Sequence, residues 1–198
     1  QNRSELIRVM RNTFALSLIG LVFAPLPMVF ANLINEVRSA KFKKLVQTFT
    51  TLPNFISWIV VFTLAFAMFS SDGMVNNALA KAGIAATVNP LGNNDHAWMF
   101  QWALATWKTL GWSAIIYIAS IAGIDQELYD AAQVDGANRF QRIMNVTVPG
   151  LYPTFFVLLL LQISNILSNG FDQYFIFYNP LTAGKLEVLD YYVYKIGV

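Results

Sequence analysis

The chain has 198 residues, of which 56% are hydrophobic and only 12% are charged. Soluble domains carry about twice this charged share, so the composition indicates lipid as the main solvent. The net charge of +2 gives no basis for nucleic-acid binding, and the lack of cysteine excludes disulfides and thiolate metal sites.

Four stretches are long and apolar enough to cross a hydrocarbon core, which needs about 20 helical residues. They cover residues 13–33, 52–69, 97–122 and 151–167. In the first, Pro25 and Pro27 remove backbone donors and predict a kink. In the second, Pro53 is expected in the first helical turn. We therefore predict an all-α, multi-pass transmembrane helical bundle that forms a single domain over residues 1–198.

Polar segments connect these spans. Residues 70–96 are rich in Asn and Gly and predict turns with one short helix near 75–82. With four spans, six Lys and Arg residues fall on each side of the membrane, so their number does not decide the orientation. The dense Lys cluster in residues 35–51 favours that side as cytoplasmic.

The connection 125–149 predicts a short helix at its start. Asp125 is placed to cap a helix that begins at Gln126. Glu127 then falls in the first turn, where the helix dipole favours an anion.

A second short helix is expected from about Gly136 to Met144, with Asp135 as its cap. Gly136 permits a tight joint between the two helices. Pro149 is expected to start the next span. The connection is thus a helix–Gly–helix elbow between two spans.

The elbow has the composition of a docking surface. Ala131 and Ala132 leave a flat face that another backbone can approach, and Leu128, Phe140 and Ile143 are apolar anchors. Two isolated short helices are marginal in water, so a docking partner is expected.

Several motif positions of the elbow match a known family. Asp130-Ala131-Ala132, Gly136, Val146 and Val148-Pro149 have the spacing of a conserved transporter loop. The segment resembles the EAA motif of binding-protein-dependent ABC importers, with Asp in place of Glu and Val in place of Ile and Leu. Six further segments resemble the sugar permeases of that family, nearest to the group for polysaccharide fragments and complex oligosaccharides. They are Arg11-Asn12-Thr13, Asn35-Glu36-Val37, Leu52-Pro53-Asn54-Phe55, Trp107-Lys108-Thr109-Leu110-Gly111-Trp112, Tyr178-Asn179-Pro180 and Tyr191-Tyr192-Val193-Tyr194.

The resemblance implies a bacterial inner-membrane permease subunit with about six spans, so the chain is expected to be an excerpt without the first and last. It implies a second permease subunit, similar but not identical, two ATPase subunits that bind ATP and Mg²⁺, and an extracytoplasmic solute-binding protein. No cofactor is expected in this chain. The elbow would be cytoplasmic. Its implied ATPase-coupling residues are Leu128, Asp130, Ala131, Ala132, Asp135, Gly136, Ala137, Phe140 and Pro149.

Two features are candidates for the substrate pathway. Lys108 lies in the middle of a span, where a charge either serves function or pairs with a neighbouring helix. Gln162, Asn165 and Asn169 have the i, i+3, i+7 spacing of one helix face. Such amides either line a sugar path or hold helices together.

Three alternatives remain beside a sugar importer: a permease for another solute, a channel or secondary transporter without an ATPase, and a membrane-embedded enzyme. The enzyme has the least support, because the sequence contains no HExxH or GxSxG motif, no phosphate-binding loop and no candidate metal site.

Overall fold

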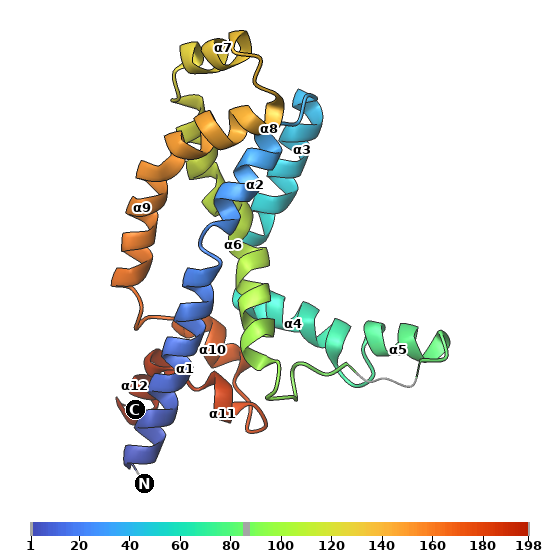
Figure 1. Cartoon of the computed structure of the whole chain (residues 1–198). Helices are drawn as coiled ribbons and strands as arrows, with labels where there is room; N and C mark the ends of the chain where they lie inside the picture. The colour runs from blue at the N-terminus through green and yellow to red at the C-terminus, as the bar shows by residue number, and fades with distance from the viewer. Residues whose placement is uncertain (1, 85–87, 198) are drawn as a thin grey trace. The chain divides into compact units, whose positions relative to one another are not determined.

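The computed structural model describes residues 2–84 and 88–197, and every regular element within them is helical. The all-α prediction is thus confirmed. The α-helices are α1 (Asn2–Val22), α2 (Leu26–Asn35), α3 (Ala40–Thr51), α4 (Trp58–Phe69), α5 (Met74–Lys81), α6 (Ala97–Ala122), α7 (Gln126–Val134), α8 (Arg139–Arg142), α9 (Val148–Ser164), α10 (Phe171–Phe177), α11 (Ala183–Leu186) and α12 (Leu189–Gly197) (Figure 1). A 3-10 helix, η1 (Leu52–Phe55), follows α3, and a π-helix, η2 (Ile143–Thr147), joins α8 to α9.

Three helical stretches within the described residues are long and apolar enough to cross a membrane. They are Arg3–Asn35, Trp58–Lys81 and Arg139–Ser164, of 33, 24 and 26 residues. Helices α6 and α7 together make a fourth stretch, bent by 70° at the break between them. The multi-pass architecture predicted from the sequence is therefore present.

The boundaries of the first two spans follow from their prolines. Residues 23–25 form a turn between α1 and α2, so the kink predicted at Pro25 is confirmed. The second span differs from its prediction, because Pro53 lies in η1 rather than in an α-helical turn. Helix α4 begins only at Trp58, where the Ser57 side chain accepts a hydrogen bond from the Val60 N–H. The short helix predicted near 75–82 is α5.

The chain divides into two compact units. The first comprises Gln1–Gly20, Ile56–Leu104 and Asn165–Val198, and the second comprises Leu21–Phe55 and Ala105–Ser164. The single domain expected over 1–198 stays a prediction.

In the first unit, α1, α4, α10 and the C-terminal segment share a hydrophobic core. Its buried side chains include Leu16, Val61, Tyr174, Phe177 and Val188. Trp58 and Phe62 both contact the Phe177 ring edge-on, with centroids 6.3 and 5.2 Å away. Aromatic packing of this kind fixes ring orientation as well as burying area.

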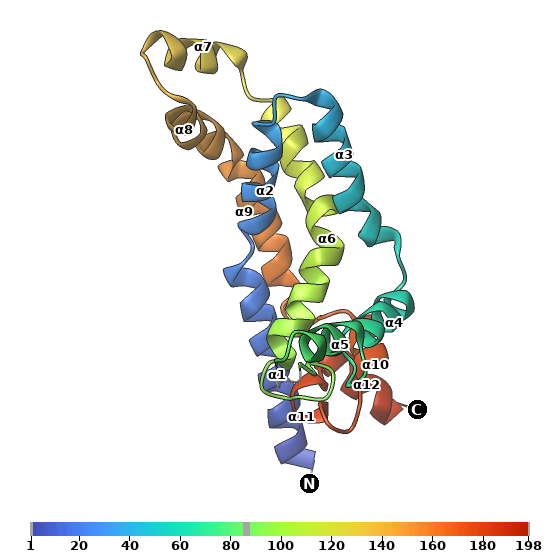
Figure 2. The same cartoon turned by 90° about the vertical axis from the view of Figure 1, so that its right-hand side faces the viewer.

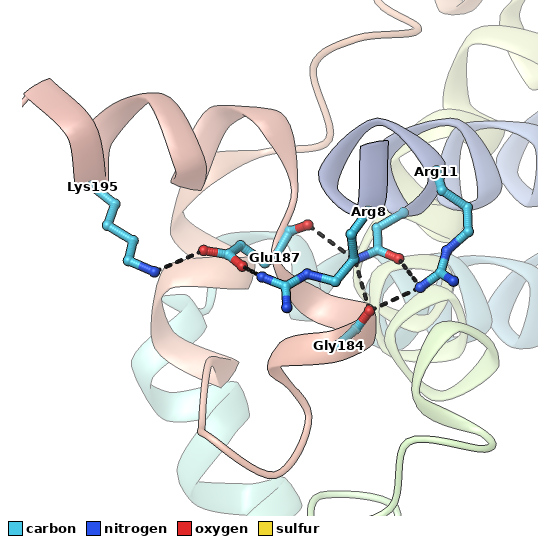
Figure 3. A network of polar contacts seen from close by, with 6 residues as sticks. Arg8, Arg11, Gly184, Glu187 and Lys195 are labelled. Atoms are coloured by element: carbon cyan, nitrogen blue, oxygen red, sulfur yellow. Dashed lines mark hydrogen bonds and ion pairs between the residues drawn. The ribbon is translucent and has the colours of Figure 1, made fainter. Parts of the chain in front are cut away.

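A buried carboxylate fastens the C-terminal segment to α1 (Figure 3). Glu187 is 1% exposed and pairs with Arg8 of α1, while its second oxygen lies 3.0 Å from Lys195 Nζ of α12. The Asn12 side-chain amide donates to the Gly184 and Glu187 carbonyls, each at 3.1 Å. Two cations offset the desolvation of Glu187, and the hydrogen bond to it raises the pKa of Lys195 above its ordinary value.

In the second unit, α2, α9 and part of α6 enclose another core (Figures 1 and 2). Ala31, Tyr117 and Leu151 are among its buried residues. The Ser120 and Thr154 hydroxyls bond each other at 2.8 Å and join α6 to α9. The span that leads into the elbow is thereby attached to the span that leaves it.

The corner where α3 passes into η1 rests on α6. At Gly111 a Cβ atom would lie 2.2 Å from the Thr50 carbonyl oxygen, so only glycine allows this approach of the backbones. One turn earlier, Lys108 Nζ donates to the carbonyls of Pro53 and Asn54 at 3.3 and 2.7 Å. The ammonium group thus satisfies carbonyls that the end of a helix leaves without partners.

Gly111→Ala is expected to destabilise the protein. A Cβ atom there meets main-chain atoms that cannot yield, and overpacking of this kind costs about 1–3 kcal/mol. The gain in helix propensity, about 1 kcal/mol, does not offset it. The measurement is thermal unfolding of the purified full-length permease in detergent.

Gly123→Ala is the matched control, since its Cβ would be 3.5 Å from the nearest atom, an ordinary contact. Equal melting temperatures for the two variants would contradict the tight packing at Gly111.

Candidate functional site

The elbow begins with the helix that the sequence predicts. Helix α7 starts at Gln126, and the Asp125 side chain accepts a hydrogen bond from the Glu127 N–H at 3.0 Å. Glu127 lies in the first turn, where its charge complements the helix dipole. The Asp125 cap is therefore confirmed.

The joint of the elbow is a fully hydrogen-bonded helix end. Gly136 has φ +76°, the left-handed conformation that favours glycine. Its N–H donates to the Gln133 carbonyl at 3.1 Å, and the Ala137 N–H donates to the Ala132 carbonyl at 2.9 Å. This pair of bonds is the Schellman motif, so Gly136 is a fixed joint, as the sequence predicted, rather than a loose one.

The second helix of the elbow has a different cap from the one expected. Asp135 ends α7 instead of starting the next helix. Asn138 caps α8, its side chain accepting from the Gln141 N–H at 2.9 Å while the Gln141 side chain accepts from the Asn138 N–H at 2.8 Å. This reciprocal capping box satisfies two donors at once, which a single Asp at 135 does not.

The second helix also runs without interruption into the span. Helix α8 passes through the π-helix η2 into α9, so the predicted start of the span at Pro149 lies inside a longer helical run. At the end of η2 the Val148 N–H donates to the Ile143 carbonyl, five residues back. The wide turn immediately precedes Pro149, which has no N–H to continue the regular ladder.

Two contacts hold the elbow at the end of its spans. The Tyr129 hydroxyl of α7 lies 2.9 Å from the Thr147 hydroxyl of η2, and Thr147 is buried. Arg139 of α8 faces Glu36, just beyond α2, with an N–O distance of 3.6 Å. The hydroxyl pair is the firmer contact, because the ion pair is half-exposed and screened by solvent.

The surface of the elbow is open and partly apolar. Leu128 and Phe140 are 54% and 70% exposed, as their predicted function in docking requires. Val134 is 88% exposed, and sequence reasoning missed it as an anchor although it ends α7 beside the joint. Three large apolar side chains of the elbow are thus exposed.

The other predicted coupling residues are exposed or half-buried on the same elbow. Asp130 and Ala131 are exposed on α7, and Ala132 and Ala137 are half-buried on the two sides of the joint. Asp135, Gly136 and Pro149 are exposed. The structure thus gathers all of these residues in one region of the second unit.

Of the two pathway features, Lys108 has a structural partner. Its ammonium group is bound by the η1 carbonyls, which fits the pairing alternative considered for a charge in a span. A function of Lys108 in the substrate pathway stays a prediction.

The three amides do not form the helix face expected of them. Helix α9 ends at Ser164, and a turn that begins with Asn165 follows it. Gln162 therefore lies in the last turn of the helix, whereas Asn165 and Asn169 lie beyond it.

Asn169 takes part in a small polar cluster of the first unit. Its Nδ2 donates to the Ser17 hydroxyl of α1 and its N–H to the Asp190 carboxylate, both at 2.9 Å. The Asn169 Oδ1 is buried and has no hydrogen-bond partner within the described residues.

Similarities to known proteins indicate the family of the chain. Residues 18–197 match the model of the family described as the binding-protein-dependent transport system inner membrane component. Among relatives, the protein LplB of Bacillus subtilis (strain 168) is 37% identical over 98% of this chain and 61% of its own length. The polygalacturonan/rhamnogalacturonan transport system permease protein YteP of the same strain is 36% identical over 96% of this chain and 60% of its own length. The chain therefore spans about three fifths of these relatives.

A solved structure shares the fold. It is that of a bacterial alginate ABC transporter in complex with its alginate pentasaccharide-bound periplasmic protein. One of its chains is 37% identical, with a TM-score of 0.92 over 98% of this chain and 67% of that one. By the match over residues 18–197 and by this common fold, the chain belongs to the family of binding-protein-dependent transport system inner membrane components.

Proposed function

We propose that the chain is part of the membrane-spanning permease subunit of an ATP-driven importer. Its cargo would be a sugar, either an oligosaccharide or a polysaccharide fragment, that a solute-binding protein delivers. The observation that carries this proposal is the elbow: a hydrogen-bonded joint with exposed apolar residues, at the positions of the EAA motif.

The chain would supply mechanical coupling, while a partner ATPase binds ATP and Mg²⁺ and hydrolyses ATP. Each of two ATPase subunits would hold the elbow of one permease subunit on the cytoplasmic side. The Schellman motif and the capping box satisfy the backbone groups of the joint by hydrogen bonds, which makes the joint stiff. A displacement of α7 by the ATPase would therefore also move α9.

The sugar cargo is supported by the relatives. Both YteP and the alginate transporter are named for polysaccharides, and both are more than a third identical to this chain. Asn169 is proposed to line the sugar path with its amide group. Gln162 and Asn165 are proposed to face the same path.

The partners follow from the same proposal. A second permease subunit, similar but not identical, would complete the pathway in the cell membrane. The periplasmic protein in the alginate transporter structure supports a solute-binding protein as the source of cargo. A permease for a non-sugar solute would use the same elbow, whereas a gradient-driven carrier would need no ATPase.

Gly136→Val is expected to lower ATP-coupled uptake by roughly tenfold or more, because a β-branched residue at positive φ is strained and would unfold the joint. Gly83→Val is the matched control, since Gly83 has φ +75° with open space around it, as Gly136 does. The measurement is sugar uptake into proteoliposomes that contain the full transporter and ATP. Equal uptake by the two variants would count against coupling through this joint.

Ala131→Trp is expected to release the ATPase, because the indole ring occupies the flat face on which the partner would dock. We expect roughly tenfold less ATPase to copurify with the variant. Ala78→Trp, at an exposed alanine of α5, provides the control. Normal ATPase recovery with Ala131→Trp would place the docking surface elsewhere.

Lys108→Met is expected to lower the stability of the permease by about 1–3 kcal/mol, because the Pro53 and Asn54 carbonyls lose their donor. Lys81→Met, at an exposed lysine, is the control. Thermal unfolding in detergent and uptake are measured together. Unchanged stability with lost uptake would favour the pathway function of Lys108 over the structural one.

A further inference from the structure

A pocket of about 430 Å³ lies beneath the elbow, in the second unit. Its walls come from three places: the segment that follows α2, the end of α6, and the elbow itself. Figures 1 and 2 show α7 and α8 beside the C-terminal ends of α2 and α6. The proposed docking function uses the outward apolar residues of the elbow and leaves this pocket without a ligand.

The charge of the pocket is strongly positive. Arg38, Arg139 and Arg142 line it, against one carboxylate, Glu36. Only Arg139 is near that carboxylate, at 3.6 Å. Lys43 Nζ adds a further cation beside the pocket, donating to the lining residue Asn35 at 3.1 Å.

Two of the arginines have no protein partner. Among the described residues, the guanidinium groups of Arg38 and Arg142 make neither a hydrogen bond nor an ion pair. A guanidinium presents five donors in a planar fork that matches phosphate and carboxylate oxygens. Two unpaired forks in one pocket are therefore donors available to an anionic ligand.

The remaining walls mix polar residues, Asn35, Gln126 and Tyr129 among them, with apolar ones. Ile121 and Ile143 line the pocket together with the buried Thr147. The pocket lies where α2 and α6 end, and both helices belong to stretches that are long and apolar enough to span a membrane. Basic pockets between the cytoplasmic ends of spans are suited to anionic headgroups.

We propose that this pocket binds a phosphate-bearing anion, and that its occupant in the cell is the headgroup of an anionic phospholipid. That the pocket lies on the cytoplasmic side rests on the proposed function. Arg38 and Arg142 hold the phosphate oxygens, while Arg139 stays paired with Glu36. The headgroup binds between the end of α2 and the elbow and stabilises the elbow at the membrane surface.

A free phosphate compound offers the same chemistry as the headgroup, so the experiment separates the two sources. The full-length permease with its partner subunits is reconstituted into nanodiscs of phosphatidylcholine, with or without phosphatidylglycerol. Inorganic phosphate is added to the neutral nanodiscs as a separate arm. Bound phosphatidylglycerol is counted by native mass spectrometry, and hydrogen exchange is followed in the elbow peptides.

The test variant is the double substitution Arg38→Gln with Arg142→Gln. The control removes the same charge at two exposed cations outside the pocket, Arg3→Gln with Lys81→Gln. Each charge-assisted hydrogen bond is worth a factor of about ten in affinity, so retention of phosphatidylglycerol should fall by roughly that factor or more in the test variant alone. Elbow protection by the anionic lipid should disappear with it.

Protection by inorganic phosphate in neutral nanodiscs, lost in the test variant, would support the phosphate site but overturn a lipid as its occupant. Equal lipid retention and equal protection in both double variants would overturn the site. Loss of the ATPase from the test variant with unchanged lipid binding would overturn it as well, and would assign the pocket to an acidic side chain of the ATPase. The number of bound lipids is measured without any transport. Normal uptake by Gly136→Val would therefore contradict the proposed function without changing the result for lipid binding.

Discussion

The second unit depends on how the chain ends a helix at the corner after α3. The end of a helix leaves carbonyl groups without partners, and such a group is costly where it is buried. The corner after α3 meets this constraint with α6: Lys108 donates to two of the freed carbonyls, and Gly111 lets the corner approach closely enough for it to do so. Without both, the α3 end would keep unpaired polar groups at an energetic cost that grows as water is excluded. The elbow is attached to the far end of this same helix.

The elbow is held mainly by local contacts. Helix α7 is too short to be stable alone in water, whereas α8 continues through η2 into α9. A Schellman motif closes the first helix, a capping box opens the second, and the Tyr129–Thr147 hydroxyl pair ties one to the other. The joint is therefore held by local hydrogen bonds, and Leu128, Val134 and Phe140 remain exposed.

Local patterns predicted the elements well and their junctions less well. The spans, the Asp125 cap and the Gly136 joint rest on residues within a few positions of one another, where sequence rules act directly. The cap at Asn138 was missed because Asp135 is an equally good cap by residue type. What distinguishes the two positions is the hydrogen bond that the Gln141 side chain accepts from the Asn138 N–H. The partner of Lys108 is about 55 positions away, so no local rule finds it. The amide stripe failed because a helix face was extended past the Asn, Ser and Gly residues that end α9.

The π-helix between α8 and α9 contains one residue more than an α-helix would need to connect the two helices in the same orientation. A π-turn holds one residue more than an α-turn of the same run, and that residue amounts to about 100° of helix rotation. Removing one residue from Ile143–Thr147 would turn the segment into ordinary α-helix while α8 and α9 kept their facing. The segment thus tolerates a single-residue deletion, whereas a deletion inside α9 would rotate every side chain before it relative to those after it.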